Sequence, residues 1–383
     1  MSQPIFQQIV SDGLTQLDTS RLTPRQWQVL HHVKDCRTET MGSYRWHCDH
    51  CGQDSEWYCS CRDRHCPVCQ GKAREEWLLK RQADTLPVTY HHVVFTLPHL
   101  FNGWACVHAD ILYKMLFKAV WQTLTEFANP RYHLDGQLGM LAVLHTWGQN
   151  LCRHIHLHCL IPGGVLTKTH EWCGTRKEGY LFPVRALSAK FRGKMLSLLQ
   201  QQGDEGKLNQ LAPQVVKQTL EQAAQKDWVV YSKPAITHAN AVVGYLARYC
   251  NRVGVSESRL SLTEEHEVNL RYKDYRTNQP AELICSTSEL LRRFLLHVLP
   301  KGFMRLRYYG FMANAIRGKA LNWIRESLHC IKEKAEVKTT TEATSTGETA
   351  VTVAVTGPAC PQCHQPGMIL LGLCPPKRNL LMT

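Results

Sequence analysis

The sequence predicts an α+β fold, in which a small cysteine-rich domain precedes a larger domain of strands and helices. Residues 139–146 and 154–162 have the apolar pattern of two strands, and the turn 147–152 joins them. Residues 104–127 are mostly apolar over a length typical of a helix. Residues 36–71 are dense in Cys, His and Trp and poor in aliphatic side chains, so they cannot form a core without a further source of stability.

Capping residues and periodicity predict the other elements. Residues 1–35 look like two short helices, because Thr23 can cap the second helix and Pro24 suits its first position. Polar surface structure with some helix is expected over 168–225. Further helices are predicted at 75–81, 236–252 and 290–299, and a further strand at 91–97.

These patterns divide the chain of 383 residues into four segments. The linker is expected to be flexible, because it is rich in Thr, Ala and Glu and almost without large apolar residues. The segments are a cysteine-rich zinc-binding and DNA-binding domain at 1–80, the larger domain at 85–330, the linker at 331–358 and a tail with a candidate zinc knuckle at 359–383.

The charge balance favours a polyanionic partner. The formal net charge is +13, and an excess of positive charge often accompanies nucleic-acid binding. No stretch approaches the roughly 18 apolar residues of a membrane helix, so no membrane partner is expected. Residues 1–18 lack the pattern of a secretory signal, and a cytoplasmic location is therefore predicted. In a reducing compartment, clustered cysteines are better explained as metal ligands than as disulfides.

Two Cys-x-x-Cys knuckles predict a zinc site in the N-terminal segment. Fourteen residues separate the pair Cys48 and Cys51 from the pair Cys66 and Cys69. Each knuckle turns two thiolates to one side, and two knuckles supply the four sulfur ligands that Zn²⁺ prefers. Four further residues could form a second site or exchange with the first set: Cys36, Cys59, Cys61 and His65. Arginines beside the knuckles favour a nucleic-acid-binding zinc module over a redox motif.

The tail contains half of another such pattern. Cys360 and Cys363 form one knuckle, and Cys374 with His364 could complete a zinc site. The alternative is an unliganded tail.

Three histidines on one predicted strand indicate a second kind of metal site. His154, His156 and His158 alternate with apolar residues, so their side chains point to the same face of the strand. Imidazoles on a rigid strand can hold one divalent cation and leave positions open for water or phosphate. The competing interpretation is a polar exposed face.

Two tyrosines on a predicted helix are candidate nucleophiles. Tyr245 and Tyr249 are four residues apart, so they share one helical face. A phenol can attack a phosphodiester and hold the DNA end covalently, and a metal on the phosphate lowers the barrier. Arg248 and Arg252 could hold backbone phosphates nearby. The competing interpretation is an amphipathic helix with half-buried tyrosines.

Five motifs in order resemble the two-tyrosine HUH transposases of bacterial rolling-circle insertion sequences, the IS91-like family. The resemblance spans roughly residues 5–330 and includes an N-terminal zinc module over Cys48 to Cys69. The motifs occupy residues 144–149, 154–164, 245–249, 272–276 and 292–303, the last leading to Arg305, Arg307, Tyr308 and Asn314.

The resemblance implies an HUH nuclease core, in which helices flank a central antiparallel sheet. It assigns His156 and His158 to Mg²⁺ or Mn²⁺ and leaves His154, His145 and Gln149 as alternatives for the third ligand. It makes Tyr245 and Tyr249 the nucleophiles. The implied substrates are single-stranded DNA at the ends of a mobile element and target DNA in the nucleoid, with a host helicase for unwinding.

Other features agree with single-strand binding. Arg305 and Arg307 stand beside aromatic residues, a composition that suits base stacking and phosphate pairing, although a basic strand end is the alternative. Two other functions remain open at this point. One is a zinc-dependent DNA-binding protein without catalysis, and the other is a plasmid replication initiator or relaxase with the same chemistry.

Overall fold

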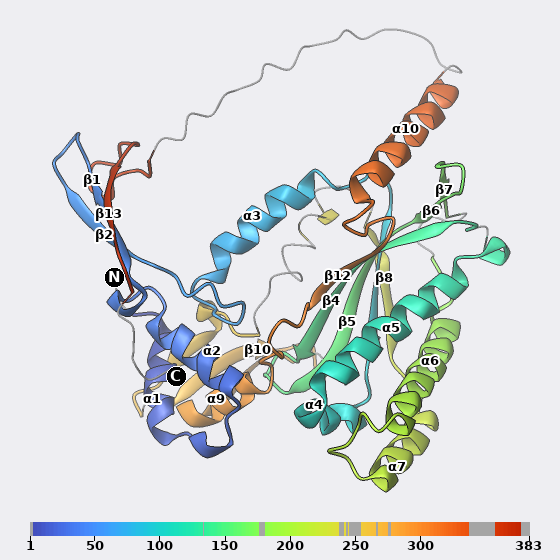
Figure 1. Cartoon of the computed structure of the whole chain (residues 1–383), viewed down its shortest axis with the longest axis horizontal. Coiled ribbons are helices and arrows are strands. Elements are labelled where there is room, and N and C mark those ends of the chain that lie inside the picture. Colours follow the sequence, from blue (N-terminus) through green and yellow to red (C-terminus); the bar gives the residue numbers. More distant parts are fainter. Residues whose placement is uncertain are drawn as a thin grey trace.

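The structure, a computed structural model, describes most of the chain (Figure 1). The described residues are 3–132, 134–175, 181–236, 241–242, 244, 254–265, 267–274, 277–336 and 357–376. The helices are α1 (Ile5–Gln16), α2 (Pro24–Asp35), α3 (Gln70–Gln82), α4 (Trp104–Val107), α5 (Ala109–Phe127), α6 (Val184–Asp204), α7 (Pro213–Ala224), α9 (Thr287–Leu295) and α10 (Arg317–Glu336). The strands are β1 (Ser43–His47), β2 (Asp54–Tyr58), β3 (Tyr90–Thr96), β4 (Gln137–Trp147), β5 (Arg153–Pro162), β6 (Gly164–Leu166), β7 (Trp172–Gly174), β8 (Val230–Ile236), β9 (Leu260–Leu262), β10 (Val268–Lys273), β11 (Pro280–Cys285), β12 (Leu306–Gly310) and β13 (Ile369–Cys374).

A seven-stranded antiparallel sheet forms the centre of the molecule. Its strand order is β7-β6-β4-β5-β3-β8, and β12 pairs with β4 beside this path. The long neighbours β4 and β5 come from the predicted hairpin, and β3 continues the sheet on the far side of β5. The α+β class and the antiparallel sheet with flanking helices are therefore confirmed.

The two faces of this sheet carry different helices. Side chains alternate along each strand, so Leu157 and Cys159 of β5 face one way and Leu160 faces the other. Leu157 and Cys159 belong to a core shared with α5, α6 and α7, which lie side by side in Figure 1. Leu160 belongs to the opposite core, which includes Ala320 and Leu321 of α10. Burial on both faces removes apolar surface from water and holds the sheet rigid.

A second lobe joins the two distant parts of the chain that flank the sheet. Helices α1 and α2 pack against α9 and the three-stranded sheet β11-β10-β9 in one core. The rings of Phe6 and Phe294 meet edge to face at 5.0 Å. The cysteine-rich segment predicted at 1–80 therefore shares its core with residues predicted to lie in the larger domain.

Several predicted elements have different limits in the structure. The predicted helix 104–127 is broken at His108, whose ring Nε2 accepts a hydrogen bond from the backbone of Gln210. Ser286 caps α9, so this helix begins at Thr287 and ends at Leu295 rather than spanning 290–299. Ile236 lies in β8, and most of the helix predicted at 236–252 is outside the described residues.

The N-terminal prediction is confirmed in detail. Thr23 and Gln26 form a capping box at the start of α2, and Pro24 occupies its first position. The linker predicted at 331–358 begins too early, because α10 continues to Glu336; residues 337–356 lie outside the described residues. None of the helices in the described part of the chain is both long and apolar enough to cross a membrane.

Gly310 provides a test of the close packing of β12 against β4. Its φ is +59°, and a Cβ at this position would lie 1.6 Å from the carbonyl oxygen of Leu138. Gly206 has a similar φ of +68° but open space around it. We expect Gly310→Ala to destabilise the fold by more than about 3 kcal/mol and Gly206→Ala by about 1 kcal/mol.

Thermal unfolding followed by circular dichroism measures both variants. Because the φ values match, the difference between the variants isolates the steric clash. Equal melting temperatures would contradict the close approach of Gly310 to β4.

Candidate functional site

Three histidines meet on the face of the central sheet that packs against α10. The core on this face, which includes Leu160 and Leu321, is called the α10 core below. His156 and His158 lie on β5, and His145 of β4 is the direct cross-strand partner of His156. One ring nitrogen from each of the three lies within 4.8 Å of the others. Such a spacing suits three ligands around a single cation.

Neighbouring groups orient two of these rings. His156 Nδ1 donates to the carbonyl oxygen of His154 at 2.8 Å, which leaves Nε2 as its ligand nitrogen. His158 Nδ1 lies 2.9 Å from Nε2 of His92 on β3, so the Nε2 of His158 is the nitrogen that can coordinate a metal. A hydrogen bond on the second ring nitrogen is typical of metal-binding histidines.

The environment keeps His156 uncharged. Burial, with a smaller contribution from the charge of His154, lowers the pKa of His156 to about 4. A neutral imidazole is the form that binds a metal, so the ring is ready to coordinate at neutral pH.

The geometry favours His145 over His154 as the third member of this group. The ring centroid of His154 lies 4.8 Å from that of His156 and 5.8 Å from that of His99, but His154 is absent from the group whose ring nitrogens lie within 4.8 Å of one another. The strand pattern alone predicted His154 because it shares the face of His156 and His158. Gln149, the other alternative, lies in the turn beyond β4, where its carbonyl accepts a hydrogen bond from Arg259.

The end of β4 is locked in place behind the trio. The pairing of β4 with β5 shifts between His145 and Trp147, and Trp147 stacks on His145 at 4.8 Å. His297 Nε2 donates to the carbonyl of Leu151, and its Nδ1 accepts from the hydroxyl of Thr146. Burial lowers the pKa of His297 to about 4, so the imidazole that bonds Leu151 and Thr146 stays neutral.

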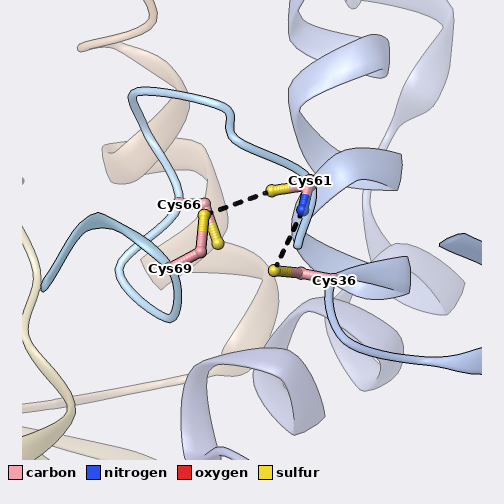
Figure 2. Close-up of side chains that lie close together, drawn as sticks. All are labelled: Cys36, Cys61, Cys66 and Cys69. Atoms are coloured by element: carbon pink, nitrogen blue, oxygen red, sulfur yellow. Dashed lines mark hydrogen bonds between the residues drawn. The ribbon is translucent and has the colours of Figure 1, made fainter. Parts of the chain in front are cut away.

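Four cysteines gather where α2, the loop after β2 and the start of α3 meet (Figure 2). Their sulfurs lie within 4.8 Å of one another, and the Cys61 and Cys69 sulfurs are 3.7 Å apart. Gln7 holds the end of α2 for this cluster by donating to the carbonyl of Cys36 at 2.6 Å. The members are Cys36, Cys61, Cys66 and Cys69.

This grouping differs from the pairing predicted by sequence spacing. The knuckle of Cys66 and Cys69 joins Cys36 and Cys61, whereas Cys48 and Cys51 lie with Cys360 and Cys363 of the tail. The two N-terminal knuckles therefore do not share one site. The physical reason is that β1 and β2 form a hairpin, which carries the first knuckle away from the end of α2.

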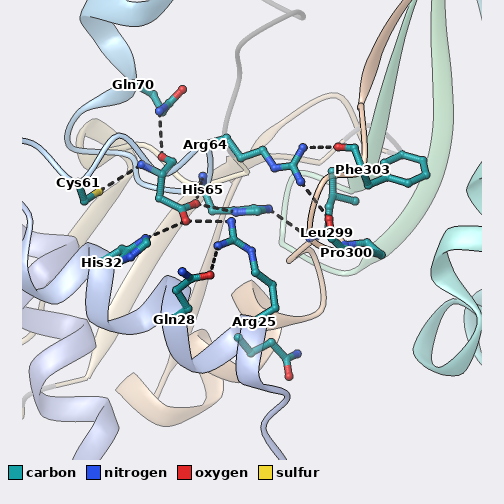
Figure 3. Close-up of polar contacts among 12 residues, drawn as sticks. Arg25, Gln28, His32, Cys61, Arg64, His65, Gln70, Leu299, Pro300 and Phe303 are labelled. Atoms are coloured by element: carbon teal, nitrogen blue, oxygen red, sulfur yellow. Dashed lines mark hydrogen bonds and ion pairs between the residues drawn. The ribbon is translucent and has the colours of Figure 1, made fainter. Parts of the chain in front are cut away.

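A buried carboxylate organises the loop between Cys61 and Cys66 (Figure 3). Asp63 accepts hydrogen bonds from Arg25 at 2.9 Å, from His32 at 3.1 Å and from His65 at 2.9 Å. Burial alone would raise the pKa of Asp63, but the bonds from His32 and His65 outweigh it and hold that pKa well below its usual range.

The same loop connects the lobe that carries the cysteine cluster, called the zinc lobe below, to the larger domain (Figure 3). His65 Nε2 accepts a hydrogen bond from the backbone of Leu299 at 3.2 Å. Arg64 donates to the carbonyls of Pro300 and Phe303, in the segment that leads into β12. These contacts connect the cysteine cluster to a strand that pairs with the histidine-bearing β4.

The predicted tyrosines and two of the predicted arginines cannot be placed. Tyr245, Arg248, Tyr249 and Arg252 lie outside the described residues. The helical residues just before them are described, and Val242 is buried in the α10 core together with Leu160 of β5. The chain therefore enters this segment on the histidine face of the sheet.

Arg305 and Arg307 lie on the other face. The pairing of β12 with β4 sets Arg307 opposite Ala142, whose side chain belongs to the α5–α6 core. The guanidinium of Arg307 stacks over Phe117 of α5 at 4.2 Å. The backbone of Arg305 accepts a hydrogen bond from Leu144 at 2.8 Å. Arg307 thus packs within the fold, away from the histidine trio.

Comparisons with known proteins agree with this combination of a zinc lobe and a histidine-bearing sheet. Residues 5–97 match the family described as "Transposase zinc-binding domain", and residues 139–320 match a family described as "Putative transposase". The chain is 38% identical to the protein y4qJ of Sinorhizobium fredii, over 91% of this chain and 90% of the relative. It is 26% identical to the transposase for insertion sequence element IS801 of Pseudomonas savastanoi pv. phaseolicola, over 76% and 72% of the two chains.

These matches define a transposase with an N-terminal zinc-binding domain. The chain belongs to the IS91-like family of insertion-sequence transposases. No solved structure matches it. The family resemblance inferred from the five motifs is therefore confirmed.

Two supporting groups were not predicted from the sequence. His92 lies on a predicted strand, but its contact with His158 depends on how β3 pairs with β5. Asp63 carried no motif of its own, although an acidic residue among Arg, His and Cys is a weak signal of a buried ion pair.

Asp63 gives a test of the docking loop. We expect Asp63→Ala to destabilise the protein by about 3–5 kcal/mol, because it leaves Arg25, His32 and His65 without their buried partner. The matched control Asp110→Ala removes a surface carboxylate paired with Lys114 and should cost less than about 1 kcal/mol.

Thermal unfolding of both variants under identical zinc concentrations measures the difference. A melting temperature of Asp63→Ala equal to that of the control would refute the central role of Asp63.

Proposed function

We propose that this transposase cuts single-stranded DNA at the ends of its mobile element through a metal site at His145, His156 and His158. The observation that carries the proposal is the trio of imidazoles held within 4.8 Å on adjacent strands. The contacts of His156 and His158 support it, because the Nδ1 of each ring has a hydrogen-bond partner and Nε2 is the nitrogen that would bind the metal.

The proposed metal is Mg²⁺ or Mn²⁺. Three protein ligands leave coordination positions for oxygens of the scissile phosphate. The bound cation would withdraw charge from the phosphate and position it for attack. The chain's own contribution is a rigid ligand set on β4 and β5, in which burial keeps His156 uncharged.

Tyr245 and Tyr249 are the proposed nucleophiles. Spacing supports this, because in the predicted helix they follow the buried Val242 by three and seven residues and would share its face. The phenol oxygen of one tyrosine attacks the phosphorus, the P–O3′ bond breaks and the 3′-oxygen takes up a proton. The products are a 5′-phosphotyrosine and a free 3′-hydroxyl.

The second tyrosine would process the target or the other end of the element. A 3′-hydroxyl then attacks the phosphotyrosine and restores a phosphodiester, so no ATP is consumed. A host helicase would supply the single strands, and the site of action would be the nucleoid.

The cluster of Cys36, Cys61, Cys66 and Cys69 is the proposed zinc site of the family's zinc-binding domain. Thiolate sulfurs about 3.8 Å apart fit a tetrahedral Zn²⁺ bonded at about 2.3 Å. The 3.7 Å between the sulfurs of Cys61 and Cys69 agrees with that spacing. Zinc would hold α2, the Asp63 loop and α3 together, and it would also place Arg62 and Arg64 beside the larger domain.

The nucleophiles are tested by covalent capture. Incubation with Mn²⁺ and a labelled single strand from the element's end should give a protein–DNA adduct that survives denaturation. Tyr245→Phe and Tyr249→Phe should each remove a step, and the double variant should give no adduct. Tyr231→Phe, which alters an exposed tyrosine of β8, is the matched control and should behave as wild type.

Adduct formation by the Tyr245→Phe/Tyr249→Phe variant would contradict the assignment of these tyrosines as nucleophiles. Binding of the strand without any adduct, at every metal tested, would instead favour a DNA-binding protein without catalysis.

The ligand set is tested by two substitutions on the same sheet face. His145→Ala should reduce metal-dependent cleavage at least about 100-fold, because it removes a ligand. His154→Ala should reduce cleavage less than about 10-fold, because the backbone carbonyl that orients His156 is retained in this variant. Initial cleavage rates as a function of Mn²⁺ concentration measure both. The opposite order of effects would reassign the third ligand to His154.

A further inference from the structure

The C-terminal segment lies beside the N-terminal hairpin, although Cys48 and Cys363 are 315 residues apart in the sequence. In Figure 1, β13 runs next to β1 and β2 at the edge of the molecule. β13 pairs antiparallel with β1, from Ser43 opposite Cys374 to His47 opposite Ile369. The three strands form a separate sheet in the order β13-β1-β2.

Two matching turns face each other at one end of this sheet. In the first turn, the amide of Cys48 bonds the carbonyl of Gln53 and the amide of Gly52 bonds the carbonyl of Cys48. In the second, the amide of Cys360 bonds Gln365 and the amide of His364 bonds the carbonyl of Cys360. The residue four places after the first cysteine has a positive φ in both turns, +69° at Gly52 and +61° at His364. The two turns are therefore equivalent knuckles.

The sulfurs of these knuckles have the spacing of a tetrahedral metal site. The sulfur of Cys48 lies 3.6 Å from that of Cys363, and the sulfur of Cys51 lies 3.7 Å from that of Cys360. All four lie within 4.8 Å of one another. A disulfide would need about 2.05 Å, whereas a tetrahedral Zn²⁺ needs about 3.8 Å between sulfurs.

Apolar burial does not explain why the tail is held here. Ile369, Leu370, Leu371 and Leu373 of β13 are 49–60% exposed. The buried core of this sheet consists of Cys48, Cys360 and Met368 with Trp46 and Cys363 at its edge. A three-stranded sheet with so small a core requires another source of stability.

We propose that Cys48, Cys51, Cys360 and Cys363 bind a second Zn²⁺, which joins the two ends of the chain in one composite site. Half of its ligands lie outside both segments that match the transposase families, at 5–97 and 139–320. The tail is thus a structural part of the zinc lobe. Cys374 pairs with Ser43 at the other end of the strand and is not a ligand.

The proposal predicts how zinc content depends on each knuckle. Full-length protein purified with zinc should contain two Zn²⁺ per chain by elemental analysis. Cys360→Ser/Cys363→Ser should contain one, and Cys48→Ser/Cys51→Ser should also contain one. Combining all four substitutions should still leave one, because both knuckles serve the same ion. The matched control Cys106→Ser/Cys152→Ser, which alters exposed cysteines outside both clusters, should retain two.

Two further variants separate ligand loss from misfolding. Cys363→His replaces one zinc ligand by another and should retain two Zn²⁺, whereas Cys363→Ser should lose one. Cys374→Ser should retain two. Three results would overturn the proposal: an unchanged zinc content in Cys360→Ser/Cys363→Ser, losses that add when the two knuckles are combined, or loss of zinc in Cys374→Ser. None of these outcomes depends on DNA cleavage. The ion that remains in each count is the one proposed at Cys36, Cys61, Cys66 and Cys69, so the loss of one Zn²⁺ relative to the wild type, rather than the total, tests the composite site.

Discussion

The pairing of β4 with β5 is the constraint on which the candidate site depends. It sets His145 directly opposite His156, so two strands contribute to one group of ring nitrogens. Because side chains alternate in a strand, the same register buries Leu157 and Cys159 against α5 and α6. A slip of one residue would move the histidines into that apolar core and would move Leu157 and Cys159 onto the histidine face. Packing of the sheet and assembly of the site are therefore one requirement.

The second organising contact is the buried network around Asp63. The Asp63 carboxylate accepts hydrogen bonds from Arg25, His32 and His65. His65 in turn accepts a hydrogen bond from the backbone of Leu299. Arg64 adds contacts to the same segment. Since that segment continues into β12 and β12 pairs with β4, the zinc lobe has a short and rigid path to the strand that carries His145. The lobe is thereby a part of the frame that surrounds the site.

The two cysteine clusters of this chain stand beside hydrophobic cores of very different size. The cluster of Cys36, Cys61, Cys66 and Cys69 adjoins the core of α1, α2 and α9, where apolar burial also contributes. The sheet β13-β1-β2 has almost no such core, and its four facing thiols are the interaction that can hold the tail. The proposed second zinc would therefore contribute more to the local fold than the first.

The sequence by itself determined the local elements, the residue types that could bind metals and the family. Periodicity predicted the β4–β5 hairpin, capping residues predicted the start of α2, and the order of five motifs identified the transposase family, because each signal lies within a short stretch of chain. Only the tertiary structure decided which residues share a site. The grouping of His145, rather than His154, with His156 and His158, the contact of His92 with His158, and the division of eight cysteines into two groups all depend on strand pairing between distant segments. Cys51 and Cys360 are 309 residues apart, a separation at which spacing carries no information about contact.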